Sequence, residues 1–325
     1  MSPHTPQLPD ALTDYVALAS QIKKTIESPD PKIQRKEFNA YRDKVRVIVF
    51  DHCPPYASPP LVYSDRVTKS LRSVANWVSL LTGGDKGTKS FVYSMISSAT
   101  ELCGNRREYH NYRHMFDVLL NAGMLTSLWF DSFECNVPRN DRNKIFLAMI
   151  LAAAFHDVVM EYHSPAGTSE RESSNALLKA HKCYAFRNHN SEGSNYLRYE
   201  VELASRLILG TVPSFRKSLK GSVARLNEDA MRVNPSQDLL NECLECNLGA
   251  ILADADVMDS LCYAYPKAIG QTNRVRRELW SNGIDANVTL DGFYTTLVPD
   301  GFISVPERIF QPIFALNLSR FKASR

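Results

Sequence analysis

Apolar residues recur three and four positions apart over most of the chain from Ser90 onward, the spacing that places them on one face of an α-helix. A similar pattern near the N-terminus predicts one more helix over residues 11–26. The main run predicts helices close to residues 91–102, 107–130, 141–156, 168–181, 199–211, 237–265 and 267–281. The chain from residue 90 to residue 281 is therefore expected to be helical.

Several segments break this pattern and divide the chain. Residues 51–65 contain two Pro-Pro pairs, which exclude a helix and predict a loop, while the preceding "VRVIVF" fits a short strand and a buried piece of helix equally well. Two polar stretches, 182–195 and 213–238, are expected to be irregular. The second stretch is mildly basic, as solvated loops often are. The alternative is that it lies over an anionic ligand.

These breaks predict three parts. An N-terminal extension spans residues 1–89, a main helical domain spans 90–282, and a tail over 283–325, rich in Gly, Pro and β-formers, is expected to be irregular and to pack on the domain.

Composition narrows the possible partners. The chain has 325 residues, of which 44% are hydrophobic and 22% charged, as in ordinary globular proteins. A net charge of +3 is too small to indicate nucleic acid or an acidic membrane as a partner. No apolar run approaches the roughly 20 residues of a membrane-spanning helix, and the N-terminus lacks the pattern of a secretory signal. Seven cysteines do not suggest a disulfide framework, so a cytoplasmic location is predicted.

Two of the predicted helices carry polar residues suited to chemistry. His110 and His114 are four residues apart, so their imidazoles share a helix face. The uncharged run Ile145–Phe155 predicts a buried helix, and it ends on His156 and Asp157. A carboxylate in such a place costs several kcal/mol unless it is paired or bound to a metal. A hydrogen-bonded His-Asp pair and a metal site explain it equally well.

A third predicted helix adds carboxylates. Asp254, Asp256 and Asp259 lie within an apolar stretch over residues 248–261, and the last two share a face. Imidazole and carboxylate donors together suit a divalent ion such as Mn, Mg, Fe or Zn. Adjacent residues differ by about 100° around a helix, so His156 and Asp157 reach one ion most easily from a helix end. The second oxygen of Asp157 is then free to bridge to a second ion.

The ordered series "YHNYRH" (109–114), "AAAFHD" (152–157) and "LADADVMDSL" (252–261) resembles the HD superfamily of metal-dependent phosphohydrolases. It is most similar to the small predicted HD phosphohydrolases, and "YPKAIGQTNRVRREL" resembles their Arg-Arg-Glu-Tyr ending. The first two blocks also resemble, more distantly, the catalytic domains of cyclic-nucleotide phosphodiesterases. The likeness covers residues 90–282 and implies an all-α fold, an HD-domain helical bundle with a mostly helical N-terminal extension.

The resemblance also implies roles for individual residues. It implies that three residues are catalytic: His110, Asp157 and Glu170. His110 matches the histidine that protonates the leaving alkoxide in phosphodiesterases. Glu170 is expected to steady metal-bound water. The metal ligands that it implies are His114, His156, Asp157 and Asp256.

Four further residues are candidates for contacts around the metal or the substrate. Asp254 is expected to orient or hydrogen-bond a ligand. His163 follows Asp157 by six residues, where it binds a second ion or a phosphate, or is simply an exposed loop histidine. Asn111 and Arg107 flank His110, and a phosphate contact and a salt bridge explain the arginine equally well.

The function implied by the resemblance is metal-dependent hydrolysis of a phosphomonoester or phosphodiester, with a nucleotide as the expected substrate and one or two divalent ions as cofactor. The expected partner is a small phosphorylated molecule, and oligomerisation is left open. Two rivals share the ligand series: an HD-type di-iron oxygenase, and a non-catalytic HD module that binds a nucleotide or a protein. Ser169 and Val212 differ from the residues that the family has at these positions, so the resemblance does not define the substrate pocket.

Overall fold

The computed structural model describes the chain almost continuously from residue 86, through the ranges 86–104, 107–132, 135–189, 196–212, 215–232, 235–262, 265–281, 292–299, 301–304 and 307–323. It also describes scattered positions between 30 and 40 and between 71 and 82. The helix expected over 11–26, the segment 45–50 and the Pro-Pro loop over 51–65 lie outside the described residues.

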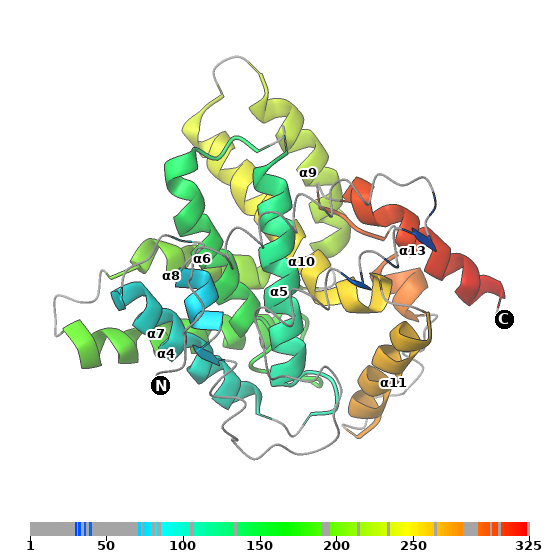
Figure 1. The fold of residues 1–325 in the computed structure, drawn as a ribbon, viewed down its shortest axis with the longest axis horizontal. Coiled ribbons are helices and arrows are strands. Elements are labelled where there is room, and N and C mark those ends of the chain that lie inside the picture. Colours follow the sequence, from blue (N-terminus) through cyan, green and yellow to red (C-terminus); the bar gives the residue numbers. More distant parts are fainter. Residues whose placement is uncertain are drawn as a thin grey trace, which may run out of the picture.

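Within these ranges every regular element is a helix, as the sequence predicts (Figure 1). In chain order the elements are α4 (Lys86–Cys103), α5 (Tyr112–Phe130), α6 (Arg139–Phe155), α7 (Thr168–His189), α8 (Arg198–Leu209), α9 (Arg216–Ala230), α10 (Gln237–Cys262), α11 (Tyr265–Ser281), the short π-helix η3 (Phe293–Leu297) and α13 (Glu307–Ala323).

The centre of the molecule is formed by α5, α6 and α10. Each residue of α6 from Ile145 to Phe155 is buried, which confirms the prediction from its uninterrupted apolar run. Helix α10 buries Leu248, Ile251, Ala255 and Met258, spaced as one helical face. Because α5 packs against both α6 and α10, residues near the ends of three separate helices are brought close together (Figure 1).

The remaining helices surround this centre. Helix α8 packs against α6 and α7, and α4 packs against α7 and α6. Helices α9, α11 and α13 each contact α10, the longest helix of the described chain (Figure 1). Helix α10 therefore connects the main core to the C-terminal part of the chain.

The stretch 213–238 is not the irregular loop that its polar composition predicts, because most of it forms α9. Its narrow apolar stripe, Val223, Leu226 and Ala230, packs on α10 against Cys243, Cys246, Ala250 and Ala253. Charged residues occupy the positions between these apolar ones, so the overall composition of the stretch does not indicate a helix. In the same way, α7 continues to His189, through half of the other stretch expected to be irregular.

The expected irregular tail also contains a long helix, α13. Pro312, which counts against a helix in a sequence, lies near its start. Phe310, Ile313 and Phe314 are buried in the main core, so tertiary packing outweighs the weak local signal. In the part of the chain that the structure describes, no helix is long and apolar enough to cross a membrane.

Candidate metal centre

Three helices supply the four residues expected to bind metal. His114 is the third residue of α5, whose first turn is capped by the side chain of Asn111. His156 is the C-cap of α6, and Asp157 follows it as the chain leaves the helix. Asp256 lies in the second half of α10. The expected helix-end position of the adjacent His156 and Asp157 is confirmed, and it lets both side chains turn toward the same point.

These four residues form a compact cluster, with one potential ligand atom from each lying within 4.8 Å of all the others. The Nε2 atom of His114 is 3.0 Å from Asp256 Oδ1 and 3.5 Å from Asp157 Oδ2. The Nε2 atom of His156 is 3.0 Å from Asp157 Oδ2 and 3.6 Å from Asp256 Oδ1. Two nitrogens and two oxygens therefore converge on one small volume.

The two imidazoles are prepared to act as ligands. His156 Nδ1 is 2.8 Å from the carbonyl oxygen of Ala153, which only accepts hydrogen bonds, so Nδ1 carries the proton and Nε2 keeps its lone pair in the neutral ring. The Nε2 atoms of His114 and His156 are both buried, and neither makes a well-formed hydrogen bond. Buried nitrogens without such partners, facing two carboxylates, fit a divalent ion that accepts N and O ligands.

The electrostatics of the cluster favour a cation. Burial lowers the pKa of the His114 imidazole, but Asp157 and Asp256 outweigh it and raise that pKa to about 9. Burial raises the pKa of Asp157, but the positive charge of His156 and the close approach of both imidazoles hold that pKa well below its usual range. Without an ion, protons on the histidines must balance the two carboxylates. A divalent ion supplies that positive charge directly.

A second group of polar residues adjoins the cluster on the side of His110. The Nε2 atom of His110 is 3.8 Å from Asp157 Oδ2, while its Nδ1 atom is 2.7 Å from Glu278 Oε1 on α11. Glu278 Oε2 also accepts the backbone N–H groups of Tyr109 at 2.6 Å and His110 at 3.0 Å. Burial raises the pKa of Glu278, but its hydrogen bond with His110 and the charge of His110 bring it down to about 2. The carboxylate therefore stays charged and anchors the imidazole.

Sequence reasoning missed two members of this group. Glu278 belongs to the block "RREL", which resembles the ending of the small HD phosphohydrolases, but nothing in the sequence links it to His110, 168 residues earlier. The hydroxyl of Tyr162 donates to Glu278 Oε1 and lies 3.1 Å from His110 Nδ1. A tyrosine in a polar loop carries no local signal of such a contact.

Arg107 and Asn111 hold backbone near the cluster. The guanidinium of Arg107 donates to the carbonyl oxygens of Asp157 at 3.1 Å and Val158 at 3.5 Å, and to that of His110 at 3.4 Å. Asn111 accepts from the N–H of Arg113 at 2.9 Å and donates to the carbonyl of Arg107 at 2.9 Å. Both residues therefore fix the segments that carry His110 and Asp157, and their contact with a substrate stays a prediction.

Asp254 does not point at the expected metal ligands. Its carboxylate accepts Arg216 Nη2 at 2.5 Å and the backbone N–H groups of Ile303 and Ser304 at 3.0 and 2.7 Å. The sequence places it beside Asp256, but a separation of two residues along a helix turns the side chains about 200° apart. Asp254 joins α10 to α9 and to residues 301–304.

Glu170 and His163 lie in different settings. Glu170 is in the first turn of α7, where burial raises its pKa and the nearby charges of Asp157 and Asp256 raise it further. Its carboxyl is therefore close enough to interact electrostatically with two of the candidate ligands. His163 is exposed and does not belong to the cluster, which agrees with an exposed loop histidine.

Comparisons with known proteins place the fold. No protein-family model matches the chain, and no curated protein matches it. Among solved structures, two are of the phosphodiesterase domain of a rhodopsin phosphodiesterase from the choanoflagellate Salpingoeca rosetta. One has a TM-score of 0.52 and 15% identity and covers 86% of this chain and 97% of that chain. The other has a TM-score of 0.54 and 16% identity and covers 86% and 93%.

At this level of identity the likeness shows the fold. The chain shares the all-helical architecture of a phosphodiesterase domain over most of its length. Membership of the HD superfamily remains a prediction from the sequence blocks.

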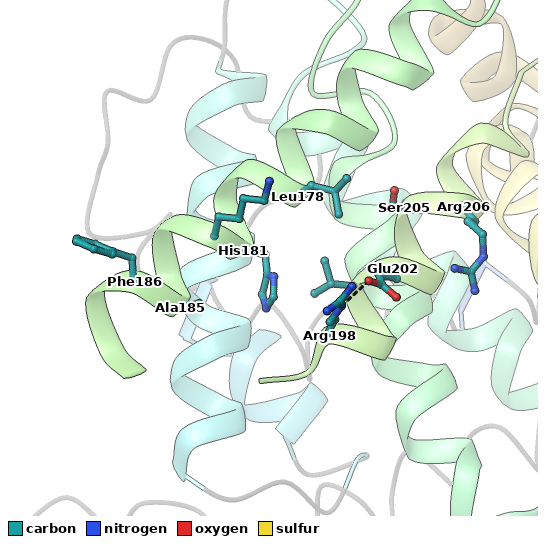
Figure 2. Close-up of a pocket in the computed structure, with 10 residues that line it drawn as sticks. Leu178, His181, Ala185, Phe186, Arg198, Glu202, Ser205 and Arg206 are labelled. Carbon is teal, nitrogen blue, oxygen red and sulfur yellow. Dashed lines mark hydrogen bonds and ion pairs between the residues drawn. The ribbon is translucent and has the colours of Figure 1, made fainter. Parts of the chain in front are cut away.

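A groove elsewhere in the molecule is separate from the cluster. It has a volume of about 660 Å³ and lies between α7 and α8 (Figure 2). None of the four candidate ligands lines it. Two of its arginines are ion-paired, Arg198 with Glu202 at 2.6 Å and Arg206 with Glu245 at 2.9 Å. The His/Asp cluster therefore remains the candidate functional site.

Proposed function

We propose that this protein is a metal-dependent hydrolase of phosphoric esters, and that a nucleotide phosphodiester or phosphomonoester is its substrate. The observation that carries the proposal is the convergence of His114, His156, Asp157 and Asp256, with His110 beside them and facing Asp157. A fold shared with phosphodiesterase domains supports the same reaction class.

The four converging residues would hold one divalent ion, and Asp157 has a second oxygen with which to contact another. When bound, such an ion acts as a Lewis acid that lowers the pKa of water and stabilises charge on a phosphoryl oxygen. His156 is buried, and the bond from its Nδ1 to Ala153 fixes the direction of Nε2. The chain therefore fixes the ligand atoms before an ion arrives, which limits the reorganisation that binding requires.

His110 would protonate the departing oxygen. Its Nδ1 faces Glu278, so Nε2 is the nitrogen left to give a proton on the side of the cluster. In the reaction, a water oxygen bonds to phosphorus and releases one proton to the solvent, the ester P–O bond breaks, and the leaving oxygen takes the Nε2 proton. General acid catalysis of this kind contributes about 10²–10⁴ in rate. Glu170, with its raised pKa, would hydrogen-bond the attacking water.

The reaction class can be tested by metal analysis combined with turnover. The wild-type protein, His156→Ala and His163→Ala would each be loaded with Mn²⁺, washed, and analysed for metal. Each would then be incubated with a panel of cyclic and linear nucleotides and simple phosphate esters. We expect the wild type to retain metal and to hydrolyse at least one class of ester. His156→Ala should lose both properties, and His163→Ala, altered at an exposed histidine outside the cluster, should keep the metal.

Other results would favour a rival function. Metal retention with oxygen consumption and no ester cleavage would favour a di-iron oxygenase, which shares this ligand chemistry. Tight nucleotide binding without turnover would favour a binding module. A wild type that retains no metal under any loading condition would remove the basis of the proposal.

A further inference from the structure

Tyr162 contacts both members of the His110–Glu278 pair. Its hydroxyl donates to Glu278 Oε1 and lies 3.1 Å from His110 Nδ1, which is itself 2.7 Å from the same Oε1 atom. Three polar atoms from α11, from the turn before α5, and from the loop after α6 therefore form a closed triangle. The roles given above to the four candidate ligands and to His110 leave this tyrosine without an assigned function.

The loop that carries Tyr162 is held at several points. It begins at Asp157, whose carbonyl accepts from Arg107, and Val159 exchanges backbone hydrogen bonds with the hydroxyl of Ser173. The N–H of Glu161, next to Tyr162, donates to the hydroxyl of Ser169 at 2.7 Å. Ser169 departs from the family pattern, and here it fixes the residue before Tyr162. The same short loop thus positions a candidate metal ligand at one end and Tyr162 at the other.

The protons in the triangle can be assigned from donor and acceptor chemistry. A carboxylate only accepts, so Glu278 Oε1 takes the single proton of the Tyr162 hydroxyl and the proton on His110 Nδ1. The phenol oxygen lies 3.1 Å from Nδ1 and can accept from the same N–H group. Burial and the hydrogen bond to Glu278 raise the pKa of Tyr162, which keeps its hydroxyl protonated. His110 Nδ1 therefore has two neighbouring acceptors, whereas Glu278 alone would give it one.

We propose that Tyr162 is a positioning residue for His110, which fixes the plane of the imidazole so that Nε2 faces the His/Asp cluster and the leaving oxygen. The catalytic part of this inference rests on the proposed hydrolase function, because only a proton donor needs its ring held in that orientation. The positioning itself is a property of the protein that can be measured without any turnover.

The positioning is tested by the proton on His110 Nδ1. Proton NMR spectra of the full chain, loaded with diamagnetic Mg²⁺ or Zn²⁺, would be recorded for the wild type, Tyr162→Phe and Tyr199→Phe. Tyr199 lies on α8 and is partly exposed, so its variant is a matched control for loss of a phenol. We expect a far-downfield resonance in the wild type and the control, assigned by its loss in His110→Gln, and a broadened or missing resonance in Tyr162→Phe.

The catalytic consequence is tested by leaving-group dependence. A cyclic nucleotide releases a basic alkoxide that needs a proton, whereas bis(p-nitrophenyl) phosphate releases a phenoxide that does not. Hydrogen bonds to charged groups support an effect on kcat of about tenfold for Tyr162→Phe with the cyclic nucleotide. The same variant should change kcat with the nitrophenyl ester far less. A merely structural defect would lower both rates together.

Each outcome decides a separate statement. An unchanged resonance in Tyr162→Phe overturns the positioning. A changed resonance with equal losses on both esters overturns its catalytic role. A wild type that hydrolyses neither ester, nor any of the nucleotide panel, overturns the proposed function, while the resonance still decides whether Tyr162 holds His110.

Discussion

Two aspartates on α10, only two residues apart, show what separates a structural carboxylate from a candidate ligand. Asp254 is fully buried, with a side-chain exposure of 0%, and it receives hydrogen bonds from Arg216, Ile303 and Ser304. The side chain of Asp256 is 28% exposed, and it lies 3.0 Å from His114 Nε2, which makes no well-formed hydrogen bond.

The difference lies in where the compensating charge comes from. The fold supplies Asp254 with a guanidinium and backbone donors, so its site is complete. Around Asp256 it supplies a second carboxylate and two imidazoles, a set that is balanced only by added protons or by a cation. Burial alone therefore does not identify a functional carboxylate. A better sign is a cluster with more potential metal-ligand atoms than hydrogen-bond donors to satisfy them.

The largest effect should follow from Asp256→Asn, which replaces a charged ligand by a neutral one of the same shape. Loss of an outer partner of a ligand typically costs about 10–100-fold in metal affinity, so loss of a ligand itself should exceed that range. The metal-free protein should also lose some stability, because the attraction of the Asp256 carboxylate to both histidines outweighs its burial and its repulsion from Asp157. Isothermal titration with Mn²⁺ and urea unfolding would measure the two quantities. Unchanged affinity would contradict the ligand assignment.

Asp254→Asn should lower the stability of the fold and leave metal binding intact. It leaves the Arg216 guanidinium buried without its carboxylate, and breaking such a buried pair costs about 3–5 kcal/mol of stability. While the protein remains folded, its Mn²⁺ stoichiometry should match the wild type. The control is Glu202→Gln, at an exposed ion pair, which should leave the unfolding midpoint unchanged. A selective loss of metal in Asp254→Asn would show that the two aspartates belong to one site.

Glu278 combines features of both aspartates, since it receives a full set of donors and yet lies beside the cluster. Its pKa is lowered from 4.5 to about 2, so the charged carboxylate stabilises the folded state above about pH 4.5, and this contribution is lost as the pH falls toward 2. The stability difference between the wild type and Glu278→Gln should therefore be constant near neutral pH and shrink between pH 4.5 and 2. Urea unfolding across this range measures it. A difference that does not vary with pH would mean that the carboxylate charge is not involved.

The sequence predicts the elements that carry strong local signals. The buried run of α6, the apolar face of α10 and the polar residues at their ends stand out because an apolar helix rarely carries histidine and aspartate without a reason. The sequence does not predict α9 or α13. In α9 the apolar stripe is narrow and surrounded by charges, and α13 contains Pro312, so both helices form mainly through packing on α10 and the core.

The partners of the site residues could not be predicted in the same way. The partners that make Asp254 a structural residue are 38 to 50 positions away in the chain. Glu278 and Tyr162 reach His110 through contacts between α11, a loop and the turn before α5. Such contacts depend on how helices are placed against one another, which the periodicity of a single helix does not contain.

The central claim, that the His/Asp cluster binds a divalent ion, is tested most directly by anomalous diffraction from crystals soaked separately with Mn²⁺ and Zn²⁺. We predict an anomalous peak between His114, His156, Asp157 and Asp256, at about 2.0–2.2 Å from the ligand atoms in the zinc soak. No peak there in either soak, with His114 hydrogen-bonded to Asp256, would show that protons alone balance the cluster and would contradict the account.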